Sequence, residues 1–416
     1  MYLLLLLTFI FQEANGISTS EVGRQLKTKL TQDYYKDTLP SEQMKVEINT
    51  FSILDFTMNE RDHTVEINAA VGMSWTDPKL TWNPSEHGGI NKIGFKPWKV
   101  WSPDFAVENV NTRYDKYLWS YDPLQVTSDG KVTYTPVDFY RYTCLFDMTY
   151  WPHDTHNCSL VIKSWNHGKE NLDFDVKVTP TIDLTTKNTA TGENIKDWDI
   201  SNVQVIKTTS KYPCCTDPFT DLRFSMVFTR RGPAFTWTVK VPVVCLVLLT
   251  MSIFLLPPDS GEKFMLGGFI FFITGLFLAT TVQIISASPS HTPLLVQMAA
   301  QQLLLSALSM LITIGVFRIS KTPHSTGIPA FLKGPTLGLS RLLLLGNYTD
   351  LVSSSHKSFT WTLQGDQVEL ADDSPAAIRE RERCEWVLLG ALIDRLLFIL
   401  YMAIALISFI RFSSVL

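Results

Sequence analysis

The chain has 416 residues, of which 45% are hydrophobic and 18% are charged, and its formal net charge at pH 7 is −4. This slightly acidic balance lacks the surplus of lysine and arginine that phosphate backbones attract, so bulk charge does not indicate a nucleic-acid-binding protein. The apolar residues are concentrated in a few long runs, which excludes an ordinary soluble composition and indicates a membrane protein.

The chain begins with an apolar stretch at residues 2–11, which is followed by Ala14-Asn15-Gly16. Two small residues separated by one other residue are typical of a cleavage site. The pattern therefore predicts a signal peptide over residues 1–16, although its start lacks basic residues. Its removal would place the residues that follow outside the cell, where disulfides form.

Residues 17–231 are expected to form an all-β domain. Short runs of alternating apolar and polar residues predict strands, and clusters of turn-forming residues separate them. Spacing of this kind is typical of a β-sandwich of roughly 200 residues. The predicted strands cover residues 44–53, 64–75, 131–134, 155–163 and 222–229, and a short helix is predicted before them at residues 27–34.

Cys144 and Cys158 enclose thirteen residues upstream of the long apolar runs. A disulfide between them would close a ring of about 15 residues and contribute roughly 3 kcal/mol through loop entropy. Near the middle of the ring, Trp151-Pro152-His153 combines an aromatic side chain with a rigid turn, and such a tip can press on a structure beneath it. Asn157-Cys158-Ser159 is a glycosylation sequon on the predicted outer half of the chain.

Cys214 and Cys215 are adjacent in the sequence. Consecutive Cα atoms lie about 3.8 Å apart, below the usual range of about 4.4–6.8 Å for bridged cysteines. A disulfide between them would be a strained ring that stiffens the tip of a hairpin. Two free thiols or a pair of metal ligands remain the alternative.

Four runs are each long enough to cross a hydrocarbon core of about 30 Å, which requires about 20 residues. A buried globular helix is the alternative for any single run, but four runs in one chain favour a membrane domain. They cover residues 236–257, 264–286, 293–317 and 386–410.

Lysine and arginine residues indicate the orientation of these spans. Lys263 follows the first span, and several basic residues lie at 318–384, whereas the short connection at 287–292 has no lysine or arginine. Those at 318–384 include Arg318, Lys321, Lys333, Arg379, Arg381 and Arg383. Because basic residues accumulate on the cytoplasmic side, both chain ends are expected outside the cell. The segment 232–317 then holds three spans, 318–384 is a loosely ordered intracellular loop with a charged helix at 372–383, and 385–416 holds the last span and an extracellular C-terminus.

Several short motifs occur in a fixed order along nearly the whole chain, and together they resemble the pentameric Cys-loop receptors, specifically a divergent, invertebrate-like nicotinic acetylcholine receptor α-type subunit. The resemblance implies an extracellular β-sandwich on a four-helix transmembrane bundle, with five subunits around a pore. The motifs are Trp75-Thr76-Asp77, Trp82-Asn83-Pro84-Ser85-Glu86, Trp101-Ser102-Pro103-Asp104, the cysteine ring, Tyr212-Pro213-Cys214-Cys215, Pro257-Pro258-Asp259-Ser260-Gly261-Glu262-Lys263 and Ile393-Asp394-Arg395-Leu396.

The resemblance also implies the partners of the protein. They are a small-molecule amine or related agonist, four further subunits in a homo- or hetero-pentamer, and the lipid bilayer of the plasma membrane, with a synapse as one setting. No cofactor and no nucleic acid are implied. An enzyme is not expected, because no Ser-His-Asp, metal-ligand or phosphate-loop pattern is present.

In this family an aromatic box at the subunit interface holds the agonist amine over ring faces. Trp165 and Tyr212 match two aromatic positions, and Phe219 replaces a tyrosine. Glu108 stands where a further tyrosine is expected, and Ala70 where a tryptophan is usual. Gln125, Thr133 and Thr135 match the rest of the complementary face, Cys214 and Cys215 mark the principal face, and Trp75 is expected in the sandwich core.

Two of five aromatic walls are therefore missing. Losing about 2–3 kcal/mol of cation–π contact would weaken acetylcholine binding by roughly 30-fold to over 100-fold. The hypothesis is that the pocket is wider and more polar and prefers another ligand. Glu108 either pairs with a primary amine of that ligand or is a solvated loop carboxylate.

The second span predicts the pore lining by the resemblance and by helical spacing. Glu262 and Asp259 would form acidic rings that attract cations. Bulky apolar residues at positions that usually carry hydroxyl groups or leucine would narrow the pore, so a homopentamer is expected to conduct weakly. The predicted stripe consists of Met265, Phe269, Phe272, Leu276, Ala279 or Thr280, and Gln283.

The last predicted group couples agonist binding to the pore. Arg230 and Glu60 match a pair of opposite charges in the family, with a surface pair of little energetic value as the alternative. The ring tip, Trp151, Pro152 and His153, would meet the membrane half, and His153 would make gating depend on pH. Two functions stay open: an agonist-gated cation channel subunit, or a poorly conducting binding or assembly subunit for a ligand other than acetylcholine.

Overall fold

The structure is a computed structural model, and it describes residues 19–110, 122–184, 197–213, 215–285, 291–321, 326–343, 345–346, 348–350, 359–363, 366–370 and 375–415. The chain divides into two compact units. We call residues 1–146 with 155–231 the β unit, and residues 147–154 with 232–416 the helical unit. The predicted signal peptide at 1–16 lies outside the described residues.

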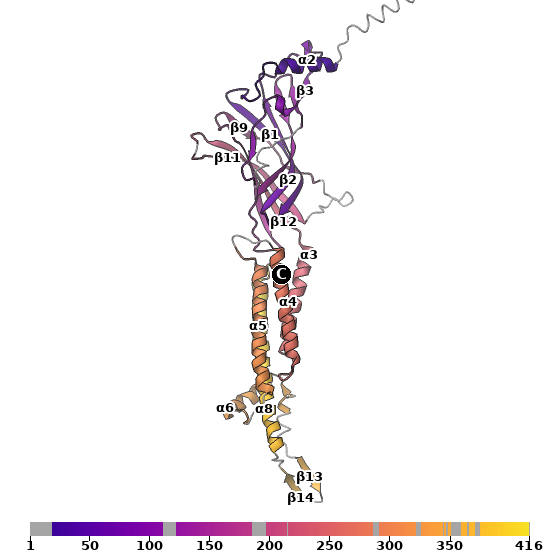
Figure 1. Cartoon of the computed structure of the whole chain (residues 1–416), viewed down its shortest axis with the longest axis vertical. Helices are drawn as coiled ribbons and strands as arrows, with labels where there is room; N and C mark the ends of the chain where they lie inside the picture. Colours follow the sequence, from indigo (N-terminus) through magenta and orange to yellow (C-terminus); the bar gives the residue numbers. More distant parts are fainter. Residues whose placement is uncertain are drawn as a thin grey trace, which may run out of the picture. The chain divides into compact units, whose positions relative to one another are not determined.

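The β unit is a two-sheet sandwich preceded by a helix (Figure 1). Its helices are α2 (Thr19–Thr31) and two short 3-10 turns, η1 (Pro84–Glu86) and η2 (Pro97–Lys99). Its strands are β1 (Met44–Asn59), β2 (Thr64–Thr76), β3 (Lys92–Phe95), β4 (Phe105–Val107), β5 (Leu124–Thr127), β6 (Lys131–Tyr134), β7 (Val137–Thr143), β8 (Thr155–Ser164), β9 (Leu172–Val176), β10 (Thr181–Ile182), β11 (Trp198–Ser210) and β12 (Phe219–Arg230).

The larger sheet has the order β10-β1-β2-β6-β5-β3, with β7 also paired to β2 and β9 to β1. The smaller sheet has the order β11-β12-β8-β4. Aromatic side chains join the two sheets: the ring centroids of Phe51 and Phe224 lie 4.5 Å apart, and those of Phe56 and Phe228 lie 5.3 Å apart. The core forms between the sheets because alternate side chains of each strand point to the same face.

All five predicted strand runs coincide with strands, namely β1, β2, β6, β8 and β12. The position of the short helix was wrong, because α2 covers Thr19–Thr31 rather than 27–34. The buried Leu26 anchors the observed helix. The glycine in the Ser128-Asp129-Gly130 turn has φ +84, a conformation that suits glycine, and this turn joins β5 to β6.

The Cys144–Cys158 disulfide is present, with the two Cα atoms 5.5 Å apart. Both cysteines are buried in the β unit. The ring therefore leaves the β unit as one continuous excursion, residues 147–154, and returns to it at Thr155.

The helical unit contains α3 (Pro233–Ile253), α4 (Glu262–Ile284), α5 (Leu294–Lys321), α6 (Ala330–Leu342) and α8 (Pro375–Arg411), and a hairpin of β13 (Phe359–Leu363) and β14 (Asp366–Leu370). Three stretches are long and apolar enough to cross a membrane within the described part of the chain: Glu262–Ile284, Leu294–Lys321 and Glu382–Arg411. The apolar helix Trp237–Ile253 is shorter. It ends at Ile253, four residues before Pro257-Pro258.

The segment 318–384 contains more structure than the predicted loose loop. Helix α6 leads to Leu345, which packs against Ala391 and Leu392 of α8. The expectation of a loosely ordered segment was therefore wrong at α6. The charged helix expected at 372–383 is the first part of α8, which continues without a break into the last apolar run.

One ion pair is buried within the helical bundle. Lys263 of α4 places its Nζ atom 2.5 Å from Oδ2 of Asp394 on α8, and the two side chains are 0% and 4% exposed. An isolated charge in apolar surroundings is costly, so each group depends on the other for its position. The pair fixes the beginning of α4 against the middle of α8.

Candidate functional site

Three aromatic side chains gather where strands of the smaller sheet end. Trp165 follows β8, Tyr212 follows β11, and Phe219 begins β12. Since β12 pairs with both other strands, their ends lie close together. The rings of Tyr212 and Phe219 meet edge to face with centroids 5.9 Å apart, and Trp165 is 43% exposed. These rings form an accessible apolar surface that can receive a ligand.

Lys163 lies over these rings. Its Nζ atom is 4.2 Å from the ring centroid of Tyr212 and 5.4 Å from that of Trp165. The same atom donates hydrogen bonds of 2.9 Å to Glu108 Oε1 and 2.9 Å to the Tyr212 hydroxyl. A positive charge of the protein itself therefore holds the cation–π position over the rings.

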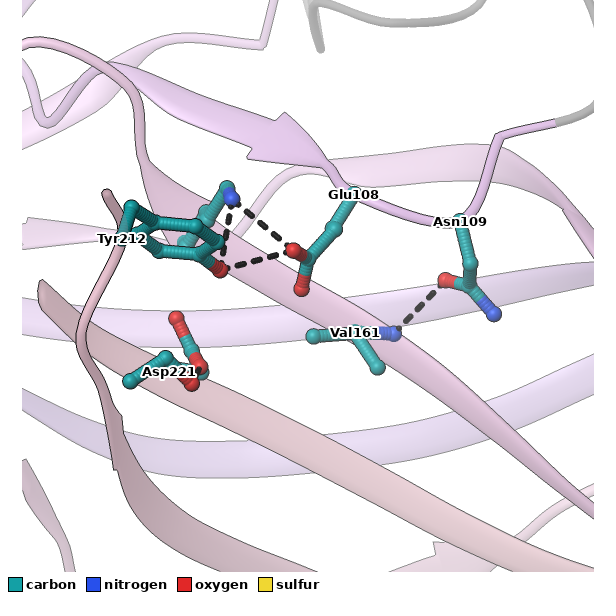
Figure 2. A network of polar contacts seen from close by, with 7 residues as sticks. Glu108, Asn109, Val161, Tyr212 and Asp221 are labelled. Atoms are coloured by element: carbon teal, nitrogen blue, oxygen red, sulfur yellow. Dashed lines mark hydrogen bonds and ion pairs between the residues drawn. The ribbon is translucent and has the colours of Figure 1, made fainter. Parts of the chain in front are cut away.

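Glu108 is held firmly beside β8. Its backbone N–H donates to the carbonyl of Val161 over 2.8 Å, and the side-chain oxygen of Asn109 accepts from the Val161 N–H over 3.1 Å. The Tyr212 hydroxyl donates to Glu108 Oε1 over 2.7 Å (Figure 2). Glu108 therefore has a tyrosine and a lysine of the same chain as hydrogen-bond partners, while its side chain is still 34% exposed.

These contacts favour the charged forms of both members of the pair. Burial acts to raise the pKa of the Glu108 carboxyl, but hydrogen bonds from Tyr212 and Lys163 outweigh it and hold the pKa below its usual value. Burial acts to lower the pKa of the Lys163 ammonium, and its bonds to Tyr212 and Glu108 reverse that effect, so its pKa is raised. Burial raises the pKa of the Tyr212 hydroxyl.

A second carboxyl group lies beneath the pair. Asp221 of β12 stands directly opposite Lys163 in the strand register, and it is labelled below Tyr212 in Figure 2. Its Oδ2 atom accepts a hydrogen bond from the Ser210 hydroxyl, whereas its Oδ1 atom is buried without a hydrogen-bond partner among the described residues. Burial raises the pKa of Asp221.

Asp104, in the motif that begins at Trp101, fixes the loop that carries Trp165. Its Oδ1 atom accepts from the Ser164 hydroxyl over 2.7 Å, and its Oδ2 atom accepts from the Asn166 N–H over 2.8 Å. These bonds span Trp165 on both sides, so they hold its ring at the end of β8.

The predicted site residues thus fall into two groups. Trp165, Tyr212, Phe219 and Glu108 come together on the smaller sheet, and Cys215 follows closely in the chain, while Cys214 lies outside the described residues. The other predicted contacts lie in the strands of the larger sheet or directly after one: Ala70 on β2, Gln125 on β5, Thr133 on β6 and Thr135 just after it.

Gln125 and Thr133 face each other in the register of β5 and β6, and both are exposed. They lie on another sheet from the aromatic cluster. Trp75 is 3% exposed and meets Trp101 edge-on at 5.6 Å, so it belongs to the core as expected. The side chain of Asn157 is exposed on β8.

Sequence reasoning missed Lys163. The available signal was a lysine at the end of the apolar run Leu160-Val161-Ile162, two residues before Trp165. Its partners lie 55 and 49 residues away in the chain, so only strand pairing brings them to it.

The predicted stripe on α4 lies on a face that the other helices leave uncovered. Exposed fractions along it run from 50% at Leu276 to 80% at Met265, with Phe269 and Phe272 between them. Glu262, Ala279 and Gln283 are exposed as well. The opposite face is buried in the bundle through Lys263, Gly267, Ile270, Thr274 and Thr281. Asp259, just before α4, lies 3.8 Å from the guanidinium of Arg383.

Glu60 and Arg230 form an ion pair in the β unit. The Nη1 atom of Arg230 is 2.8 Å from Glu60 Oε1, and the arginine side chain is only 4% exposed. The guanidinium also lies 4.1 Å from the ring centroid of Trp198. Such burial makes this more than a surface pair.

The ring tip belongs to the helical unit. Trp151 meets Phe235 of α3 with centroids 5.6 Å apart, and the carbonyl of Thr149 accepts from the N–H of Leu294 over 3.0 Å. Pro152 is buried and His153 is exposed. Within the described residues, no cluster of three or more histidine, cysteine, aspartate or glutamate side chains suits a metal ion.

Comparison with known proteins agrees with this arrangement. Residues 23–232, slightly more than half of the chain, match a family model described as the neurotransmitter-gated ion-channel ligand binding domain. The chain is similar to the neuronal acetylcholine receptor subunit alpha-2 of Homo sapiens, at 28% identity over 293 residues that cover 70% of this chain and 54% of the relative.

Two further relatives show the same level of similarity. The neuronal acetylcholine receptor subunit alpha-6 of Pan troglodytes is 28% identical over 345 residues, which cover 81% of this chain and 67% of that subunit. The acetylcholine receptor subunit alpha-L1 of Schistocerca gregaria is 28% identical over 277 residues, which cover 65% of this chain and 49% of that subunit. The chain thus spans between about half and two thirds of the length of these relatives.

Proposed function

Because this chain belongs to the family of the neurotransmitter-gated ion-channel ligand binding domain, whose members are ligand-gated ion channels and not enzymes, we propose that it is a subunit of a neurotransmitter-gated cation channel. Five subunits surround a central pore, and a small-molecule agonist binds between neighbouring β units. The chain supplies the principal face through the aromatic cluster of Trp165, Tyr212 and Phe219.

The uncovered stripe of α4 carries this proposal. It begins with Glu262 and runs over six turns on the face opposite the buried side chains of the bundle. A helix that is apolar on all sides is normally buried on all sides. The face of α4 that the bundle leaves uncovered is therefore expected to line a space or to be buried against something outside this bundle. In a ring of five subunits, that face borders the pore and Glu262 forms an acidic ring that attracts cations.

The remaining parts follow from this assignment. The subunit resides in the plasma membrane, with the β unit and the C-terminus outside and α6 in the cytoplasm. The Glu60–Arg230 pair and the ring tip carry the effect of agonist binding toward α3 and α4. Gln125, Thr133, Thr135 and Ala70 form the complementary face that meets the next subunit.

Voltage clamp of cells that express the full chain tests the proposal. Application of a panel of small amines and amino acids is expected to open a current. The reversal potential of this current should follow the cation gradients and not the chloride gradient. Glu262→Gln should reduce the preference for cations over anions, because it removes the acidic ring. Glu170→Gln, which alters an exposed loop carboxylate of the β unit, is the matched control and should leave selectivity unchanged. An anion-selective current in the unaltered chain would refute the assignment.

One observation favours a subunit that conducts poorly alone. Phe269 and Phe272 place two aromatic rings per subunit on the uncovered stripe, with exposed fractions of 59% and 62%. Ten such rings around one axis would obstruct ions by size and by dewetting. Co-expression with a second subunit of the family that carries hydroxyl residues at these positions should then give larger currents than this chain gives by itself.

A further inference from the structure

We propose that Lys163 is a built-in occupant of the aromatic cluster, so that the site rejects purely cationic ligands and selects a zwitterion whose carboxylate binds Lys163 and whose cationic end faces Glu108. This inference rests on the proposed function, because it names the ligand class of the same site.

The first step is that the position for a cation is already filled. The Lys163 ammonium lies within 6 Å of two ring centroids, at 4.2 Å over Tyr212 and 5.4 Å over Trp165, which is the range in which ring faces attract cations. A quaternary ammonium that approached the same faces would meet a like charge at contact distance. Lys163 is 9% exposed and held by two hydrogen bonds of 2.9 Å, so it is not a mobile surface lysine.

The second step concerns the bonding capacity that the pair retains. An ammonium group has three N–H donors, and Glu108 and Tyr212 take two of them, which leaves one for a ligand. Glu108 receives both of its hydrogen bonds at Oε1, and its Oε2 atom accepts none among the described residues. The Glu108 side chain is 34% exposed, so this oxygen has access to solvent.

The third step combines these two vacant groups. The site offers one positive donor and one negative acceptor side by side, next to the rings of Trp165 and Tyr212. A zwitterion presents the complementary pair of charges and adds no net charge to a site in which Glu108 already balances Lys163; burial raises the pKa of the second carboxyl group, Asp221, opposite Lys163. A plain cation satisfies only Glu108 and is repelled by Lys163, whereas a carboxylate on the same ligand converts that repulsion into a charge-assisted hydrogen bond.

Equilibrium binding to the purified full chain in lipid nanodiscs tests the inference. The probes are choline and trimethylglycine, which share a quaternary ammonium and differ in a hydroxymethyl group against a carboxylate. The unaltered protein is expected to bind trimethylglycine at least about tenfold more tightly than choline. Lys163→Met keeps the apolar stem and frees both Glu108 and the ring faces, so it should bind choline at least about tenfold more tightly than the unaltered protein and should reverse the order of the two probes.

Lys207→Met is the matched control, because Lys207 lies on β11 of the same sheet and pairs with Asp173 at 2.7 Å rather than with Glu108 or Tyr212. It should leave both affinities unchanged. Equal affinity of the unaltered protein for the two probes overturns the choice of a zwitterion. A Lys163→Met protein, or a Lys163→Gln protein if the first fails to fold, that binds choline no better than the unaltered protein overturns the occupancy by Lys163.

The binding measurement does not require an open pore. An anion-selective current together with the expected binding order would refute the channel assignment and leave the inference about the ligand intact. The reverse outcome, a cation current with no difference between the probes, would refute the inference alone.

Discussion

Glu108 and Lys163 determine the chemical character of the aromatic cluster. The lysine supplies the cation that ring faces attract, and the glutamate balances its charge. The sequence left open whether Glu108 pairs with a primary amine of the ligand or is a solvated carboxylate, and in the structure its partner is the amine of Lys163. At the position of Glu108 a carboxylate replaces an aromatic wall, and Lys163 lies over the rings. These two features form one arrangement, because each side chain holds the other in its charged form.

The stability of the β unit should depend on pH through Glu108. The pKa of this carboxyl is lowered from 4.5 by folding, so its contribution is present above about pH 4.5 and is lost as pH falls through the folded-state value. Glu108→Gln is expected to cost about 0.5–1 kcal/mol at pH 7, since solvent screens a partly exposed pair, and to cost nothing at a pH below both values. Thermal unfolding at several pH values measures the difference.

Glu170→Gln serves as the control for this experiment, because it removes an exposed carboxylate of the same unit. The thermal stabilities of Glu108→Gln and the unaltered protein are compared at each pH. A stability difference that stays constant from neutral to acidic pH would contradict the role of the charged pair.

At the scale of elements, α4 has one face committed to the bundle and one left open. Gly267 lies on the committed face, where an added Cβ atom would meet the side chain of Met310 on α5 at 3.1 Å. Gly268 has no neighbour within 4 Å of such an atom among the described residues. Close packing of α4 on α5 therefore explains the first glycine and not the second.

The open face should control conduction. Replacement of Phe269 and Phe272 by serine is expected to raise the current from cells that express this chain alone by at least about tenfold, because smaller polar groups lower the dewetting barrier. Phe271→Ser is the matched control: Phe271 is also exposed, at 41%, but lies off the predicted stripe. Whole-cell current normalised to surface expression is the measurement. An equal rise in the Phe271→Ser variant would contradict the assigned pore face.

The Lys263–Asp394 pair should couple α4 to α8. Removal of either charge alone, by Lys263→Met or Asp394→Leu, leaves the other buried and is expected to cost about 3–5 kcal/mol. The double variant Lys263→Met/Asp394→Leu should recover a large part of that loss, because no unpaired charge remains. Yield and melting temperature of the purified protein give the comparison, and additive losses in the double variant would show that the two groups act separately.

At the scale of the whole molecule, the proposed function needs a second copy or a related subunit to complete the agonist site. The aromatic cluster lies on the smaller sheet, whereas Gln125 and Thr133 lie on strands of the larger sheet and Thr135 just after one of them. The full chain has a mass of 47.1 kDa. We expect it to purify as a particle of about five chains, either when it is expressed alone or only when a partner subunit is expressed with it. Mass measurement of the detergent-extracted particle distinguishes these results from a monomer, which would refute the shared site.

Local patterns accounted for much of the fold. The alternation of apolar and polar residues located β1, β2, β6, β8 and β12, and long apolar runs located α4, α5 and the membrane part of α8. The position of α2 and the presence of α6 were not predicted. Both helices depend on packing against distant residues, such as the contacts that Leu345, just after α6, makes with Ala391 and Leu392 of α8.

By itself, the sequence determined where the chain enters apolar surroundings, which runs form strands, and which aromatic residues belong to one site, because periodicity and motif order are local properties of the chain. Only the tertiary structure decided that Lys163 meets Glu108 and Tyr212, and that Lys263 meets Asp394. Pairing of β4, β8, β12 and β11 creates the first set of contacts, and the long side chain of Lys263 reaches Asp394 within the helical bundle. Charged partners at such separations in the chain leave no local pattern, since their distance in space is set by the elements that carry them.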